Sequence, residues 1–176
     1  MRGTRIKFMA VLSTLVLVGA TATAAQGSDD DERTRARLIG YEEVPAVSTE
    51  GGGTFRARMV DDDAFTFRLS YDELSSHVQQ AHIHFGQKRV NGGISVFLCS
   101  NLGNGPEGTA PCPDSGVVTG TITAAQVVGP AAQGITAGEF DELLAAIRAG
   151  LTYANVHTDT FPGGEIRGQL RNRHHH

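Results

Sequence analysis

The histidines His82, His84 and His157 have the residue type and spacing of a metal site. The first two lie in the run Ala81-His82-Ile83-His84-Phe85, which has the composition of an extended strand. Alternate side chains of a strand share a face, so both imidazoles project together while Ile83 points into a core. His157 ends a second strand-like run, and three imidazoles are enough to hold one ion of copper, zinc or nickel.

This site requires that the two strands be neighbours, because His157 can join the pair only across the ~4.8 Å that separates adjacent strands. Tyr153 and Asn155 would share the face of His157. A carboxylate of Asp159 or Glu165 would be placed to accept an imidazole N–H and so orient a ligand. The alternative is that the three histidines are ordinary hydrogen-bonded residues on a polar sheet face. The run His174–His176, a native tail or a purification tag, is excluded from the site.

The elements that must position these residues are short β-like runs separated by turn residues, the pattern of an all-β sandwich or barrel. One segment, residues 137–149, departs from it. There a capping-box sequence, Thr136-x-x-Glu139, precedes apolar residues at helical spacing and predicts an amphipathic helix packed over the sheet rather than offered to a partner. The eight predicted strands are Thr34–Gly40, Gly53–Val60, Ala64–Tyr71, Val78–Phe85, Ile94–Cys99, Val117–Thr123, Leu151–His157 and Glu165–Leu170.

The N-terminus has the features of an export signal. Basic residues precede an apolar run, and small residues follow it, so residues 1–24 are predicted to be a cleaved signal peptide. The alternative, a retained anchor, is disfavoured because the run is shorter than the ~20 residues that span a membrane. We expect a secreted or periplasmic protein, with an acidic flexible linker over residues 25–34 and a basic, histidine-rich tail over residues 172–176.

The charge of the chain argues against one class of partner, and its two cysteines predict a disulfide. Without residues 1–24 the chain keeps 12 basic against 19 acidic residues, a net charge of −7, which argues against nucleic acid as a partner. Cys99 and Cys112 are the two cysteines of an exported chain, so they are predicted to form a disulfide. Closing that loop contributes about 3 kcal/mol in the chain-entropy model. The alternative, a cysteine metal pair, lacks zinc-knuckle spacing.

Ordered motifs across the chain resemble the CHRD domain family, which is named for repeats in chordin. The resemblance covers residues 35–171 and implies a Greek-key β-sandwich in a secreted protein, while implying little about activity. It rests on the runs Leu38-Ile39-Gly40-Tyr41-Glu42-Glu43-Val44-Pro45-Ala46-Val47, Ala81-His82-Ile83-His84, Leu151-Thr152-Tyr153-Ala154-Asn155-Val156-His157-Thr158 and Phe161-Pro162-Gly163-Gly164-Glu165-Ile166-Arg167-Gly168-Gln169-Leu170.

A weaker resemblance is to the copper-side motifs of copper/zinc superoxide dismutases. It implies copper ligation by His82, His84 and His157, with Arg167 as the anion-steering group. No bridging histidine stands between Phe85 and Val117 and no zinc-ligand cluster is present, which argues against dismutase activity.

Two function classes follow from these observations. One is an exported protein with a mononuclear site, copper favoured and zinc the alternative, for metal binding or redox work. The other is a non-catalytic adhesion, matrix or protein-interaction module without metal.

Overall fold

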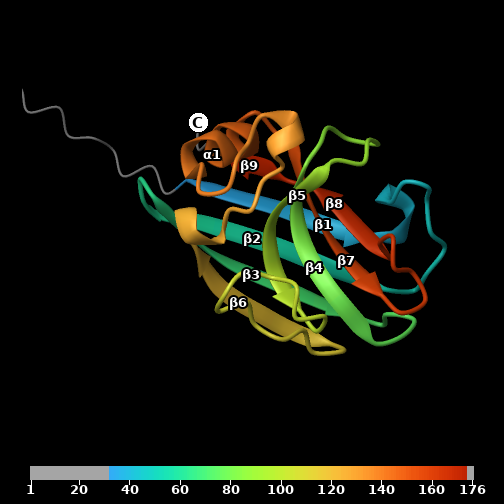
Figure 1. Ribbon diagram of the computed structural model, residues 1–176. Helices are drawn as coiled ribbons and strands as arrows, with labels where there is room; N and C mark the ends of the chain where they lie inside the picture. The colour runs from blue at the N-terminus through green and yellow to red at the C-terminus, as the bar shows by residue number, and fades with distance from the viewer. Residues whose placement is uncertain (1–31, 174–176) are drawn as a thin grey trace, which may run out of the picture.

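The fold is one antiparallel sheet curled into a nearly closed barrel, as the computed structural model of the chain shows for residues 32–173 (Figure 1). The strand order is β5-β4-β7-β8-β1-β2-β3-β6, and β9 pairs with β1. The edge strands β5 and β6 contact each other. The elements are β1 (Arg33–Ile39), η1 (Gly40–Glu42), β2 (Gly52–Asp61), β3 (Ala64–Asp72), β4 (Val78–Phe85), β5 (Gly93–Ser100), β6 (Gly116–Ile122), η2 (Ala124–Gln126), η3 (Ala131–Gln133), α1 (Phe140–Arg148), β7 (Thr152–Thr158), β8 (Ile166–Gln169) and β9 (Arg171–Arg173).

The all-β prediction is confirmed, and each of the eight predicted strands is present with its ends shifted by no more than one residue. Strand β1 shows why the pattern was informative, because Thr34, Ala36 and Leu38 are buried while the residues between them are exposed. The ninth strand extends the sheet into the segment assigned to the tail. The predicted signal peptide, all but the end of the linker and the three C-terminal histidines lie outside the described residues.

The helix is shorter than predicted, spanning Phe140–Arg148 instead of residues 137–149. Gly138 has φ 88°, a left-handed conformation that a right-handed helix cannot include. The predicted capping pair forms a separate turn, in which the Thr136 N–H donates to the Glu139 carboxylate at 2.6 Å. The four predicted apolar positions are all buried: Phe140, Leu143, Leu144 and Ile147.

Helix α1 closes one end of the barrel, above the first residues of β1 (Figure 1). Its Leu144 and Ile147 line a small apolar pocket together with Phe55 and Ile83 of the sheet. The Phe140 ring lies 5.9 Å from that of Phe65 on β3. The helix therefore belongs to the core, as predicted. Among the described residues, no helix has the length and apolar character needed to cross a membrane.

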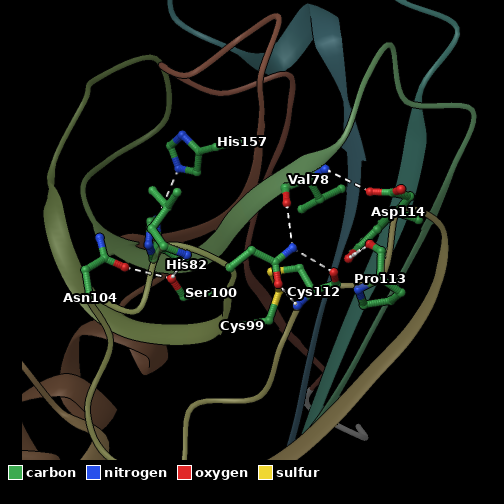
Figure 2. Close-up of a disulfide and its surroundings, with 12 residues drawn as sticks. Val78, His82, Cys99, Ser100, Asn104, Cys112, Pro113, Asp114 and His157 are labelled. Atoms are coloured by element: carbon green, nitrogen blue, oxygen red, sulfur yellow. Dashed lines mark hydrogen bonds between the residues drawn. A yellow bond between two sulfur atoms is a disulfide. The ribbon is translucent and has the colours of Figure 1, made fainter.

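The predicted disulfide between Cys99 and Cys112 is confirmed. Cys99 lies on β5 directly across from Ala81 of β4, so the bridge fixes the following loop beside the strand that carries the first two histidines. Asn101 extends this attachment, because its side-chain amide donates to the carbonyl oxygens of Val78 and Cys112, both at 2.8 Å (Figure 2).

Candidate metal centre

Strands β4 and β7 are antiparallel neighbours, which is the condition the site required. In their register His82 lies opposite Asn155, and His84 lies opposite Tyr153. Ile83, between the two histidines, is fully buried in the core. The three imidazoles therefore share the outer face of the barrel, and they are buried there by surrounding segments: 0% of His82, 7% of His84 and 7% of His157 is exposed.

The three rings converge on one point. One ring nitrogen from each histidine lies within 4.8 Å of the other two. The closest pair is His82 Nδ1 and His157 Nε2, 3.1 Å apart and drawn as a dashed line in Figure 2. Tetrahedral coordination with nitrogens at 2.0–2.1 Å from an ion separates ligand nitrogens by about 3.3 Å. The closest pair already has about that spacing, and since the three ligand atoms lie within 4.8 Å of one another, His84 would reach it by a shift of at most about 1.5 Å.

Carbonyl oxygens on either side of the site fix two of the rings. His84 Nδ1 lies 2.9 Å from the Gly92 carbonyl oxygen, and His157 Nδ1 lies 2.9 Å from that of Pro162. A carbonyl only accepts hydrogen bonds, so both rings carry their proton on Nδ1 and keep the lone pair on Nε2. His82 Nδ1 then donates to His157 Nε2 in the metal-free protein. For Nδ1 to ligate an ion, His82 would have to take its other tautomer, with the proton on Nε2.

The environment keeps all three imidazoles neutral. Burial is the main cause in each case, and it lowers the pKa of His82 to about 2 and that of His84 to about 4. Burial also lowers the pKa of His157, against the opposing effect of its bond to Pro162. Within residues 32–173, Nε2 of His84 is buried without any hydrogen-bond partner, and so is Nε2 of His82, the atom that would carry the proton if Nδ1 ligated an ion. Neutral, unpaired imidazole nitrogens are the form in which histidine binds metal.

Arg167 and Tyr153 support the ring of His84. The Tyr153 ring stacks on His84, and the Arg167 guanidinium carbon lies over the Tyr153 ring, 3.4 Å from its centroid. Arg167 is 1% exposed, and its N–H groups donate to the Asn91 side chain at 3.1 Å and to the Val90 carbonyl at 2.8 Å. The residue expected from the dismutase resemblance to steer anions is thus placed against the loop of residues 86–92.

That loop also reaches His84 directly through Gly92, a residue the sequence patterns did not indicate. The Gly92 carbonyl accepts from His84, and its N–H donates to the Tyr153 hydroxyl at 3.2 Å. A Cβ at Gly92 would overlap the Phe85 carbonyl oxygen, so only glycine fits this approach. A glycine next to Gly93 and Asn91 reads as a simple turn, and its role becomes visible only with the tertiary contact.

The family model of the CHRD domain matches residues 34–170. The chain belongs to the CHRD domain family. This confirms the resemblance on which the fold was expected, over nearly the same residues. A search of curated proteins found no match, and neither did a search of solved structures. CHRD domains are extracellular modules, and the disulfide of this one fits an oxidising compartment.

Glu43 adds a carboxyl group to the surroundings of the site in this CHRD domain. It is 7% exposed, and the Asn155 amide donates to it at 3.5 Å. Burial raises its pKa to about 7, an effect only partly offset by the nearby charge of Arg167. Gly164, with φ 125°, brings its backbone against both side chains, and a Cβ there would lie 2.7 Å from Asn155 Nδ2. Sequence reasoning noted Glu43 only inside a family motif.

The two carboxylates expected to orient the imidazoles make other contacts in this CHRD domain. Glu165 is buried and accepts from the hydroxyls of Thr49 at 2.6 Å and Thr158 at 2.7 Å. Asp159 is exposed and accepts from the Gln79 side chain at 3.1 Å. In the described part of the chain, the hydrogen bonds that orient His84 and His157 come from backbone carbonyls instead.

Proposed function

We propose that this CHRD domain binds one transition-metal ion through His82, His84 and His157, as a secreted or periplasmic metal-binding or redox protein. The observation that carries the proposal is the approach of His82 Nδ1 to His157 Nε2 at 3.1 Å, beside the buried and unpaired Nε2 of His84. Burying Nε2 of His84 without a partner costs free energy, and an ion bound to it would recover part of that cost.

Copper is the favoured ion and zinc the alternative. All three ligands are imidazoles, and both cysteines are held in the disulfide, so no thiolate contributes. For a given set of nitrogen ligands, Cu²⁺ binds more tightly than Zn²⁺. Copper supplies one-electron chemistry when bound. The chain holds the site for it: Gly92 and Pro162 orient two ligands, while Tyr153 and Arg167 keep the His84 ring in place.

Metal titration tests the proposal. The background is the chain with His174, His175 and His176 replaced by alanine, so that the C-terminal run cannot contribute. We expect His82→Ala, His84→Ala and His157→Ala each to weaken Cu²⁺ binding by at least tenfold, because loss of an orienting or direct ligand interaction has effects of this size. His77→Ala is the matched control, since His77 is exposed and bonds Asp114 instead. Electron paramagnetic resonance should show nitrogen coupling from three imidazoles.

Equal Cu²⁺ affinity in the background protein and in the His82→Ala/His84→Ala/His157→Ala triple variant would overturn the proposal. Circular dichroism and the unfolding midpoint of the metal-free triple variant establish that it is folded, so that lost binding is not misread. With metal binding refuted, the interaction-module function of an extracellular domain would stand.

A further inference from the structure

A second feature of the barrel is a face of arginines on its outer surface, away from the histidine strands. The cross-strand register places Arg35 opposite Arg171 on one side and opposite Arg56 on the other, and Arg56 opposite Arg68. The row therefore crosses β9, β1, β2 and β3. All four side chains are exposed. We call these four residues, together with Arg37, the next outward residue of β1 two positions after Arg35, the arginine face.

This arrangement is electrostatically unfavourable for an isolated protein. Like charges directly opposite each other on neighbouring strands destabilise a sheet, and the strands are ~4.8 Å apart, so the row places its charges within about 14 Å. The chain as a whole has a net charge of −4, so the positive charge is a local concentration rather than a property of the composition. A bound anion would relieve the repulsion.

No carboxylate neutralises the arginine face within the described residues. The ion pairs within the described residues join Lys88 to Glu42, Arg148 to Glu32 and His77 to Asp114, and none of them includes an arginine of this face. Two shallow grooves run over the face instead. One is lined by Arg35, Arg56 and Arg68, and the other by Arg35, Arg37 and Arg171, with the Lys88–Glu42 ion pair at its border. The two grooves share Arg35 and Arg56, so the arginine side chains lie along neighbouring grooves that are open to solvent.

We propose that the arginine face binds a linear anionic polysaccharide through its sulfate or carboxylate groups. A guanidinium pairs with such oxyanions through two parallel hydrogen bonds, and a row of arginines matches a ligand whose charges repeat along a chain. The outward positions of β1, β2 and β3 are mainly arginine, threonine, serine and valine, with Ile39 and Asp72 at strand ends, and none is aromatic, so the bases of a single-stranded nucleic acid would find no stacking platform. An extracellular domain also meets polysaccharides more directly than nucleic acids.

Heparin and polygalacturonate are the probes, the first sulfated and the second carboxylated, measured by calorimetry at two salt concentrations. The variant is Arg35→Gln/Arg56→Gln/Arg68→Gln. Exposed ion pairs contribute up to about 1 kcal/mol each, so we expect its affinity for the preferred probe to fall about ten- to a hundredfold. The charge-matched control adds three negative charges at exposed positions on other elements: Leu102→Glu/Ala132→Glu/Ala145→Glu. It should retain most of the affinity.

The arginine variant should be at least as resistant to urea as the parent, because it removes repulsion, so lost binding cannot be attributed to unfolding. Three outcomes would overturn the proposal: no binding of either polysaccharide, equal loss in the charge-matched control, or tighter binding of single-stranded DNA or phosphatidylserine vesicles than of both polysaccharides. The His82→Ala/His84→Ala/His157→Ala variant should bind the polysaccharide with the affinity of the parent. The polysaccharide proposal and the metal proposal are therefore tested independently.

Discussion

The phenol ring of Tyr153 lies parallel to the imidazole of His84, with 4.8 Å between the ring centroids and 2° between the ring planes. These residues are direct cross-strand partners on β7 and β4, so the sheet register itself sets the stack. The guanidinium of Arg167 also lies over the Tyr153 ring, so the tyrosine contacts both the imidazole and the arginine. The direction of the His84 lone pair depends on this stack.

Replacing Tyr153 with leucine should both destabilise the protein and weaken metal binding. The change removes an aromatic pair and a buried cation–π contact and leaves a cavity, for a loss of roughly 2–4 kcal/mol in unfolding free energy. Tyr153→Phe is the control, since it keeps both stacks and loses only the hydroxyl that accepts from Gly92. Urea unfolding and copper titration of both variants measure the difference. A phenylalanine variant as impaired as the leucine variant would mean that the hydroxyl, not the stack, matters.

The metal-free protein should lose stability as the pH falls below neutrality. An unfolded histidine has a pKa of about 6.5, whereas in the fold the pKa of His82 is about 2 and that of His84 about 4. Between pH 6.5 and 4 the unfolded chain binds protons that the folded chain excludes. The stabilising contribution is therefore complete above pH 6.5 and declines toward pH 4. We expect a net loss of roughly 1–3 kcal/mol between pH 7 and pH 5.

Urea unfolding across this pH range provides the measurement. The His82→Gln/His84→Gln/His157→Gln variant should show a flatter pH dependence, because glutamine does not titrate. His77→Gln is the control, since His77 is exposed and its bond to Asp114 shifts its pKa upward instead. An unchanged slope in the triple variant would assign the acid sensitivity to other groups.

Glu43 should affect the pH dependence of stability in the direction opposite to that of the histidines. Its pKa in the fold is raised from 4.5 to about 7, so its contribution to stability is present below pH 4.5 and is lost as the pH rises through 7. Glu43→Gln keeps the neutral form at every pH. Relative to the parent, this variant should gain about 1–2 kcal/mol in unfolding free energy between pH 5.5 and pH 8.5. Glu50→Gln, an exposed position in the following loop, is the control. A parallel pair of pH profiles for Glu43→Gln and parent would contradict the raised pKa.

Leu144→Ala tests whether α1 belongs to the core. Leu144 is 5% exposed and lines a small apolar pocket with Phe55 of the sheet, so truncation should cost about 2–5 kcal/mol. Glu142→Ala, on the exposed side of the same helix, should change stability by less than about 0.5 kcal/mol. Equal small effects in chemical denaturation would indicate a helix that adds little to the barrel.

The strands of the sheet could be predicted because each strand is recognisable from the pattern of its own residues. The predicted strand Val78–Phe85 matches β4 to the residue, and the alternation along Ala81–Phe85 placed His82 and His84 on one face. The start of α1 was not predictable from the capping pair, because the left-handed backbone at Gly138 separates that turn from the helix. What orients the histidines lay beyond sequence reasoning altogether. The carbonyls of Gly92 and Pro162 have no side-chain signature, and the burial that raises the pKa of Glu43 depends on loops distant in sequence.

Strand β9 places the last residues of the fold beside the first. Arg173 is the cross-strand partner of Arg33, so the described chain begins and ends on adjacent antiparallel strands. A domain with adjoining ends can be set into a surface loop of a host protein without separating the two points of attachment. The same geometry allows residue 173 to be joined to residue 33 by a short linker and new ends to be opened elsewhere. The barrel could therefore be inserted into another polypeptide with its binding surfaces intact.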